Sequence, residues 1–229
     1  MYEKAAALGH AGAQMNAAVL LARGDGTYGT KPDRRRALGL LQQASANGCV
    51  EAMVYLGVQH CHRATMELPI NPDPIYGACL LQAAAEKGNV EAQLQFAICH
   101  ALGLGVPKNK ALAREWLLDP ALRGVARAQY NLGVLLDDGS LDASVGQAGD
   151  WLRAAAGQGH SNAVYNLGCM HARRSGGGAM RVAADHFRTA ASLGHQAAAE
   201  NLARLNARSR DSDSRNGDNL ASAASNARA

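Results

Sequence analysis

The sequence predicts an all-α protein, a right-handed α-solenoid built from antiparallel pairs of helices. Three observations predict this fold: an alanine-rich composition, a repeat of 35 to 40 residues, and apolar residues at helical spacing inside each repeat. Of the 229 residues, 48% are hydrophobic but only 4% are aromatic. A core made mainly of alanine and leucine is typical of closely packed helices.

Six glycines mark the repeat, and we call them the anchor glycines. Successive anchors are 39, 40, 36, 35 and 35 residues apart. An alanine stands four residues after every anchor, and a leucine or phenylalanine stands seven residues before each of the last five. A period of this length is the sequence signature of stacked helical repeats. The anchor glycines are Gly9, Gly48, Gly88, Gly124, Gly159 and Gly194.

The offsets fit two helices in each repeat. Ala128, Leu132 and Leu135 are spaced by four and then three residues, which places them on one stripe of a helix. Each anchor falls just after a helix, where glycine takes a left-handed conformation at little steric cost. Small residues nine positions after an anchor, such as Gly133 and Gly168, should let neighbouring helices approach closely. We call the helix after an anchor the A helix and the helix before the next anchor the B helix.

The repeats are expected to occupy residues 1–207. This span contains half a repeat over residues 1–9, then about five repeats and a terminal helix. The half repeat is either a natural cap or the remainder of a repeat whose first helix lies outside the sequence. Residues 208–229 are rich in Ser, Asn, Asp and Arg and contain a single leucine, so we expect a disordered tail there.

Charge and apolar patterning argue against nucleic acid and membranes. The formal net charge is +4, and the basic residues are dispersed rather than clustered. No apolar stretch approaches the roughly 18 residues of a membrane span, and the N-terminal residues do not resemble a signal peptide. We therefore expect no nucleic-acid partner, no membrane insertion, and a location in the cytoplasm or another reducing compartment.

The cysteines point to the same kind of compartment. Their number is odd and they lack paired spacing, so no structural disulfide is expected. Each is expected to pack as a small buried apolar residue. The five are Cys49, Cys61, Cys79, Cys99 and Cys169.

No motif indicates catalysis, a cofactor or a metal. Residues 24–29 match Gly-x-Gly-x-x-Gly, but a dinucleotide site needs a strand before that loop, and a helix is expected there. His60, His100 and His171 share one repeat position, but stacking separates equivalent side chains by roughly 10 Å, which is too far for one ion. We expect these histidines to be packed or to cap helices. The motifs of serine hydrolases and of Walker-type nucleotidases are missing from the sequence.

A longer pattern recurs around the later anchors. It consists of Ala101-Leu102-Gly103-Leu104-Gly105-Val106, Trp116-Leu117, Ala128-Gln129-Tyr130-Asn131-Leu132-Gly133 and Tyr165-Asn166-Leu167-Gly168. Over about residues 1–207, the chain resembles the Sel-one-like repeat (SLR) family, a helical branch of the tetratricopeptide superfamily. The resemblance implies an adaptor or scaffold that binds other proteins. Some secreted members carry a disulfide in each repeat, but the corresponding positions here hold alanines such as Ala85 and Ala92.

The resemblance also implies where a partner binds. In tetratricopeptide relatives the A helices line a concave groove, with contacts three, six, seven and ten residues after the anchor. An asparagine amide can donate to and accept from a peptide backbone, and tyrosine adds a large contact area. The groove residues are Asn16, Tyr55, Glu91, Gln95, Arg127, Tyr130, Asn131, Asn162, Tyr165, Asn166 and Asn201.

Alternatives remain for both the residues and the function. The asparagines could instead bond to neighbouring helices inside the solenoid. The favoured function is a non-catalytic scaffold or adaptor that binds a protein or peptide in the groove. The alternative is an integral subunit or assembly factor of a larger complex, with the convex face or the ends buried. An enzyme is disfavoured because the minimal motifs are missing.

Overall fold

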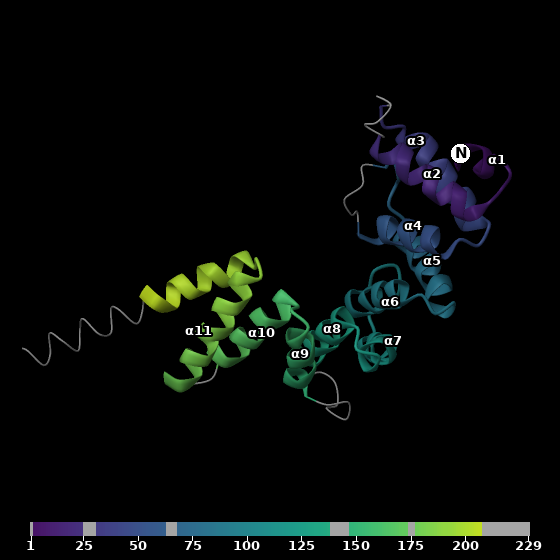
Figure 1. Ribbon diagram of the computed structural model, residues 1–229. Helices are drawn as coiled ribbons and strands as arrows, with labels where there is room; N and C mark the ends of the chain where they lie inside the picture. The colour runs from purple at the N-terminus through teal and green to yellow at the C-terminus, as the bar shows by residue number, and fades with distance from the viewer. Residues whose placement is uncertain (1, 25–30, 63–67, 138–146, 174–176, 208–229) are drawn as a thin grey trace, which may run out of the picture. The chain divides into compact units, whose positions relative to one another are not determined.

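The computed structural model describes residues 2–24, 31–62, 68–137, 147–173 and 177–207 (Figure 1). The regular secondary structure in these ranges is helical, without strands, as predicted. The tail expected over 208–229 lies outside the described residues. The chain divides into two compact units, Met1–Arg123 and Gly124–Ala229, which we call unit 1 and unit 2.

Each unit consists of A and B helices that pack as successive pairs. Unit 1 contains the pairs α2/α3, α4/α5 and α6/α7, preceded by α1, and unit 2 contains the pairs α8/α9 and α10/α11, followed by a helix over 196–207. The bounds in unit 1 are α1 Tyr2–Ala7, α2 Ala11–Arg23, α3 Arg34–Ala46, α4 Val50–His62, α5 Pro74–Glu86, α6 Val90–Leu102 and α7 Lys110–Leu122. The bounds in unit 2 are α8 Ala126–Asp137, α9 Ala148–Gly157, α10 Ser161–Ala172 and α11 Gly177–Ser192.

The anchor glycines have the predicted backbone conformation. All six have φ between +80° and +86°. At Gly159 the backbone N–H donates to the Ala156 carbonyl at 2.9 Å, and the next N–H, of His160, reaches back to the Ala155 carbonyl at 3.2 Å. These bonds satisfy carbonyls at the end of α9, so the anchor ends the B helix and reverses the chain into the next A helix.

The close approach of helices within a pair is also confirmed. A Cβ atom at Gly133 would lie 2.8 Å from Leu152 Cγ, and one at Gly168 would lie 2.7 Å from Phe187 Cε1. In unit 1, a Cβ atom at Gly57 would lie 2.7 Å from Leu81 Cγ. A large B-helix side chain therefore rests directly on the backbone of the A helix. We call this contact the glycine seat.

The core follows the repeat pattern. The alanines four residues after the anchors are buried except the first, which is half-buried, and the residues seven before the anchors are at most 3% exposed. The buried alanines are Ala52, Ala92, Ala128, Ala163 and Ala198, and the buried B-helix residues are Leu41, Leu81, Leu117, Leu152 and Phe187.

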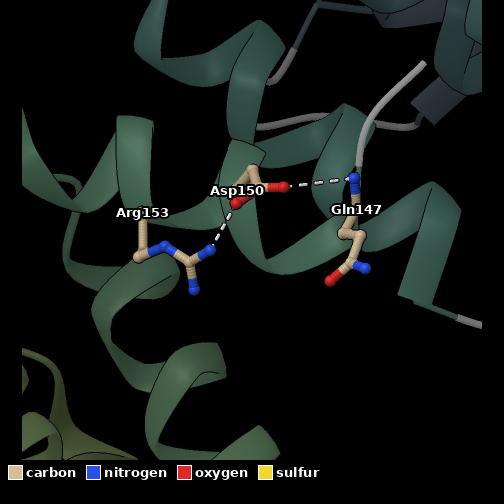
Figure 2. A network of polar contacts seen from close by, with 3 residues as sticks. All are labelled: Gln147, Asp150 and Arg153. Carbon is tan, nitrogen blue, oxygen red and sulfur yellow. Dashed lines mark hydrogen bonds and ion pairs between the residues drawn. The ribbon is translucent and has the colours of Figure 1, made fainter.

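Polar caps fix where the B helices begin. The side chains of Asp33, Asp73 and Asn109 each accept a hydrogen bond from the backbone N–H three residues later, at 3.0 to 3.1 Å. At the start of α9 the bond runs the other way: the backbone N–H of Gln147 donates to Asp150 at 3.3 Å, and Asp150 also pairs with Arg153 (Figure 2). These four caps keep the B helices α3, α5, α7 and α9 in register even though the loop before each varies in length.

The expectation that all five cysteines are buried is wrong. Cys61 and Cys99 are buried, but Cys49 and Cys169 are half-buried and Cys79 is exposed. Cys79 lies on α5 two residues before the buried Leu81. Because successive helical positions point about 100° apart, the two side chains point to nearly opposite sides of the helix, which leaves Cys79 exposed. All five are free thiols.

The anchor conformation can be tested with two neighbouring glycines. A Cβ atom added at Gly157 or at Gly159 would meet no neighbouring atom within 4 Å, but only Gly159 has a positive φ, of +80°. We expect Gly159→Ala to lower the free energy of unfolding by roughly 1 kcal/mol, because alanine is strained in the left-handed region. Gly157→Ala should leave it unchanged or raise it slightly. Urea denaturation of both variants measures the difference, and equal effects would show that the anchor conformation is not required.

Candidate functional site

An open cleft of about 360 Å³ lies on the A helices α4 and α6 of unit 1. We call it the α4–α6 cleft. Its position follows from the fold, because equivalent faces of successive A helices lie side by side when repeats stack. The lining residues are Glu51, Val54, Tyr55, Val58, Gln59, Asn89, Glu91 and Gln95.

The structure brings three predicted groove residues together here. Tyr55, Glu91 and Gln95 come from two successive repeats and line the same cleft. The five other lining residues were not predicted. Glu51, Val54 and Val58 could have been, because they stand three, six and ten residues after their anchor, at the offsets given for the groove.

The polar groups of the cleft are partly satisfied by one another. The amide nitrogen of Gln95 donates to Glu91 Oε1 at 2.7 Å, and Asn89 caps α6 by accepting from the backbone N–H of Ala92 at 2.9 Å. Glu51 accepts a hydrogen bond from the thiol of Cys49 at 3.3 Å. Burial raises the pKa of Cys49, and the neighbouring Glu51 carboxylate raises it further. Both glutamates lie in the first turn of their helices, where the helix dipole stabilises negative charge.

Tyr55 is the one aromatic side chain in the cleft. It is half-buried, and within the described part of the chain its hydroxyl oxygen is inaccessible and has no partner in hydrogen-bonding geometry. Burial raises the pKa of this phenol, and the nearby charge of Arg23 and amide of Gln59 lower it to a smaller extent. The ring is therefore neutral at physiological pH and presents mainly apolar surface to the cleft.

In unit 2 the predicted tyrosines pack against histidines that follow the next anchor. Tyr130 stacks on His160 with ring centroids 4.6 Å apart, and Tyr165 stacks on His195 at 4.3 Å. The amide of Asn201 donates to the Tyr165 hydroxyl at 3.1 Å. These contacts join one A helix to the next, so at Asn201 the structural alternative for the asparagines is observed.

The two histidines also cap helices. The Nδ1 atoms of His160 and His195 accept hydrogen bonds from the backbone N–H groups of Ala163 and Ala198, at 3.3 and 3.2 Å. An accepting Nδ1 carries no proton, so the cap requires the neutral imidazole. Burial lowers the pKa of His160, and the positive charge of Arg127 lowers it further.

The remaining predicted groove residues are distributed over both units. Asn131 and Asn166 are half-buried. The exposed ones are Asn16 on α2, Arg127 on α8 and Asn162 on α10. The structure thus brings Tyr55, Glu91 and Gln95 into a cleft, whereas Tyr130 and Tyr165 serve contacts between repeats.

The histidines considered for metal binding are packed, as expected. His60 accepts a hydrogen bond from the backbone N–H of Asp73 at 3.2 Å, and His100 packs edge-on against Phe96. His171 stacks on His186. Across the residues that the structure describes, no group of three or more His, Cys, Asp or Glu side chains is placed to hold a metal ion.

Comparison with family models identifies the repeat. A model of the Sel1 repeat matches residues 1–10, 11–49, 50–89, 90–118, 126–160 and 161–195. The chain belongs to the Sel1 repeat family. Matches beginning at 11, 50, 90, 126 and 161 start where the A helices α2, α4, α6, α8 and α10 begin, so the family repeat and the helix pair coincide.

Among curated proteins, the chain is similar to DAP3-binding cell death enhancer 1 of Rattus norvegicus. The two are 30% identical over 106 residues, which cover 46% of this chain and 20% of the relative. The chain therefore matches only about a fifth of the length of that protein.

Two of the solved structures similar to this chain illustrate the shared fold. One is c5321, a protective antigen of uropathogenic Escherichia coli with an SLR fold (TM-score 0.72, 24% identity, covering 90% of this chain and 44% of that one). The other is a Sel1 repeat protein from Oxalobacter formigenes (TM-score 0.72, 20% identity, covering 85% and 75%). At these identities the similarity establishes the fold alone.

Within the described residues, no helix combines the length and apolar character needed to cross a membrane.

The histidine caps predict a pH dependence of stability. The folded-state pKa of His160 is lowered from the usual 6.5, so its contribution to stability is present above about pH 6.5 and is lost as pH falls through the folded-state value. We expect the free energy of unfolding, measured in urea, to be lower at about pH 5.5 than at about pH 7.5.

His160→Asn provides the control for this prediction. Asparagine keeps a cap acceptor but does not titrate, so the difference between the two pH values should become smaller. An unchanged difference would show that the His160 cap is not the titrating element.

Proposed function

We propose that this chain is a non-catalytic scaffold that binds a partner protein through the face formed by its A helices. Sel1 repeat proteins are generally protein-interaction scaffolds, and the α4–α6 cleft is the observation that carries the proposal for this chain. The cleft spans two successive repeats, so its shape depends on how they stack. A surface of this kind suits an extended peptide or a partner helix.

The chemistry of the cleft suits such a partner. Val54 and Val58 provide apolar surface beside the ring of Tyr55. The amides of Asn89 and Gln95 stand at the same cleft and can exchange hydrogen bonds with a peptide backbone. An apolar, aromatic centre with polar groups around it is the usual arrangement of an interface that concentrates its binding energy in a few residues.

The A-helix positions of unit 2 offer a candidate contact surface of their own. Asn131 and Asn166 occupy equivalent positions there, and Arg127 and Asn162 are exposed. The rings of Tyr130 and Tyr165 pack on histidines, so we assign these tyrosines to the support of the face and the neighbouring asparagines to partner contact.

A specific observation favours the alternative function, a subunit or assembly factor. Large apolar side chains are exposed on two B helices of unit 1. Ile75 on α5 is 68% exposed and Leu122 on α7 is 69% exposed. Burial of these residues in a larger complex would explain their exposure in the isolated chain.

Matched lysine substitutions distinguish the two functions. We expect Val58→Lys to reduce partner capture from native extract at least tenfold, because loss of an interface anchor typically costs about 2 kcal/mol or more. Leu122→Lys should leave capture unchanged. Deletion of residues 208–229 should also change it little.

Further measurements separate a loss of partner binding from a loss of folding, and the scaffold function from the subunit function. Leu122 is already 69% exposed and lies outside the cleft lining, so Leu122→Lys also controls for the introduction of a lysine. Circular dichroism of each variant should show unchanged helix content. Capture lost with Leu122→Lys but retained with Val58→Lys would favour the subunit and reject the groove.

A further inference from the structure

Two buried thiols from different repeats touch in unit 1. The Sγ atoms of Cys61 on α4 and Cys99 on α6 are 3.7 Å apart, and the Cys99 thiol donates to the Cys61 sulfur. The Cys61 thiol in turn donates to the Pro74 carbonyl at 3.6 Å. Cys61 is 8% exposed and Cys99 is fully buried.

We propose that Cys61 and Cys99 form a redox-sensitive pair that hydrogen peroxide converts reversibly into a disulfide between α4 and α6. This site differs from the disulfides of the secreted relatives, which join positions within one repeat that are alanines here. Neither thiol belongs to the lining of the α4–α6 cleft. The proposal therefore stands independently of the function assigned to that cleft.

The geometry favours this pair over any other described pair of cysteines. A disulfide requires a sulfur–sulfur distance of about 2.05 Å, so the two sulfurs must approach by roughly 1.7 Å. Rotation of the cysteine side chains about χ1 moves the sulfurs toward each other. Gly77 on α5 accommodates the Cys61 sulfur where it now lies, because a Cβ atom there would be 2.7 Å from that sulfur. Cys49 contacts Glu51 instead, and Cys79 is exposed.

The reaction balances with peroxide as the oxidant. The Cys61 thiolate attacks one peroxide oxygen and breaks the O–O bond, which gives a sulfenic acid and hydroxide. The Cys99 sulfur then attacks the Cys61 sulfur, the S–S bond forms, and the sulfenic oxygen leaves as water with the Cys99 proton. In total, two thiols and one peroxide yield one disulfide and two waters. Thiol–disulfide exchange with a dithiol reductant restores both thiols.

The surroundings give the two thiols different roles. Cys61 retains some exposure, so a molecule as small as peroxide reaches it first. Its pKa is lowered because Cys99 donates a hydrogen bond to it, whereas the same bond and burial raise the pKa of Cys99. Cys61 is therefore the thiol that reacts with peroxide, and Cys99 is the resolving thiol. In a reducing compartment such a disulfide is transient, which suits a sensor and not a structural bridge.

The bridge would connect the same two helices that line the α4–α6 cleft. Cys61 lies two residues beyond the last lining positions of α4, and Cys99 lies four residues after Gln95 of α6. Oxidation would thus fix the spacing of α4 and α6 near one end of the cleft. Any effect on partner binding rests on the proposed function, whereas formation of the disulfide does not.

Peroxide treatment of the full-length chain tests the proposal. We expect the intact mass to fall by two hydrogen atoms, peptide mapping to find Cys61 linked to Cys99, and dithiothreitol to reverse both changes. Cys79→Ser should retain the cross-link, and Cys61→Ser and Cys99→Ser should lose it. The wild-type mapping decides the question even if a serine variant fails to fold.

Three results would overturn the proposal. They are a folded chain whose Cys61 and Cys99 stay reduced, a cross-link that uses Cys79 or a second chain, and oxidation of Cys61 to sulfinic acid without a bridge. Partner capture by the oxidised and reduced chains is a separate measurement. If the bridge forms and capture does not change, the modification site stands and its coupling to the cleft is rejected.

Discussion

The rest of the structure depends on the glycine seat, the contact that places a large B-helix side chain on the backbone of its A helix. Leu81, Leu152 and Phe187 all rest on a glycine in this way. Because the seat brings two helix axes close together, alanine is large enough to fill the remaining core. The low aromatic content of the chain is thus a consequence of short interhelical distances, and the core stays packed without large side chains.

The binding face follows from this packing. Once a B helix has packed on its A helix, the anchor glycine that follows reverses the chain and places the next A helix beside the previous one. Residues at the same repeat position then become neighbours, which brings Tyr55 and Gln95 to one cleft. The same stacking places Tyr130 on His160. The position seven residues after the anchor thus lines the cleft in unit 1, and the position six residues after the anchor makes a contact between repeats in unit 2.

The fold could be predicted from the sequence because its signals are local. The anchors require a positive φ that glycine adopts readily, and the positions of alanine and leucine follow the helical period. Six of the eight cleft residues stand at the groove offsets, so they can be found by counting from the anchors, and Tyr55, Glu91 and Gln95 were predicted in this way.

Contacts between repeats could not be predicted in this way. Cys61 and Cys99 stand thirteen and eleven residues after their anchors, so no shared offset links them. They meet because α4 and α6 approach at a particular stagger. The exposure of Cys79 depends on the rotation of α5, and composition does not determine that rotation.

A double-mutant cycle at one glycine seat tests the central claim most directly. Gly133→Ala should destabilise unit 2 by roughly 1–3 kcal/mol, because the new Cβ atom overlaps Leu152, and Leu152→Ala should cost roughly 2–5 kcal/mol by leaving a cavity. In the double variant the new methyl group no longer meets the leucine, so the combined cost in urea denaturation should be smaller than the sum by about 1 kcal/mol or more. Additive costs, within about 0.5 kcal/mol, would show that the two residues do not depend on each other and would contradict the glycine seat.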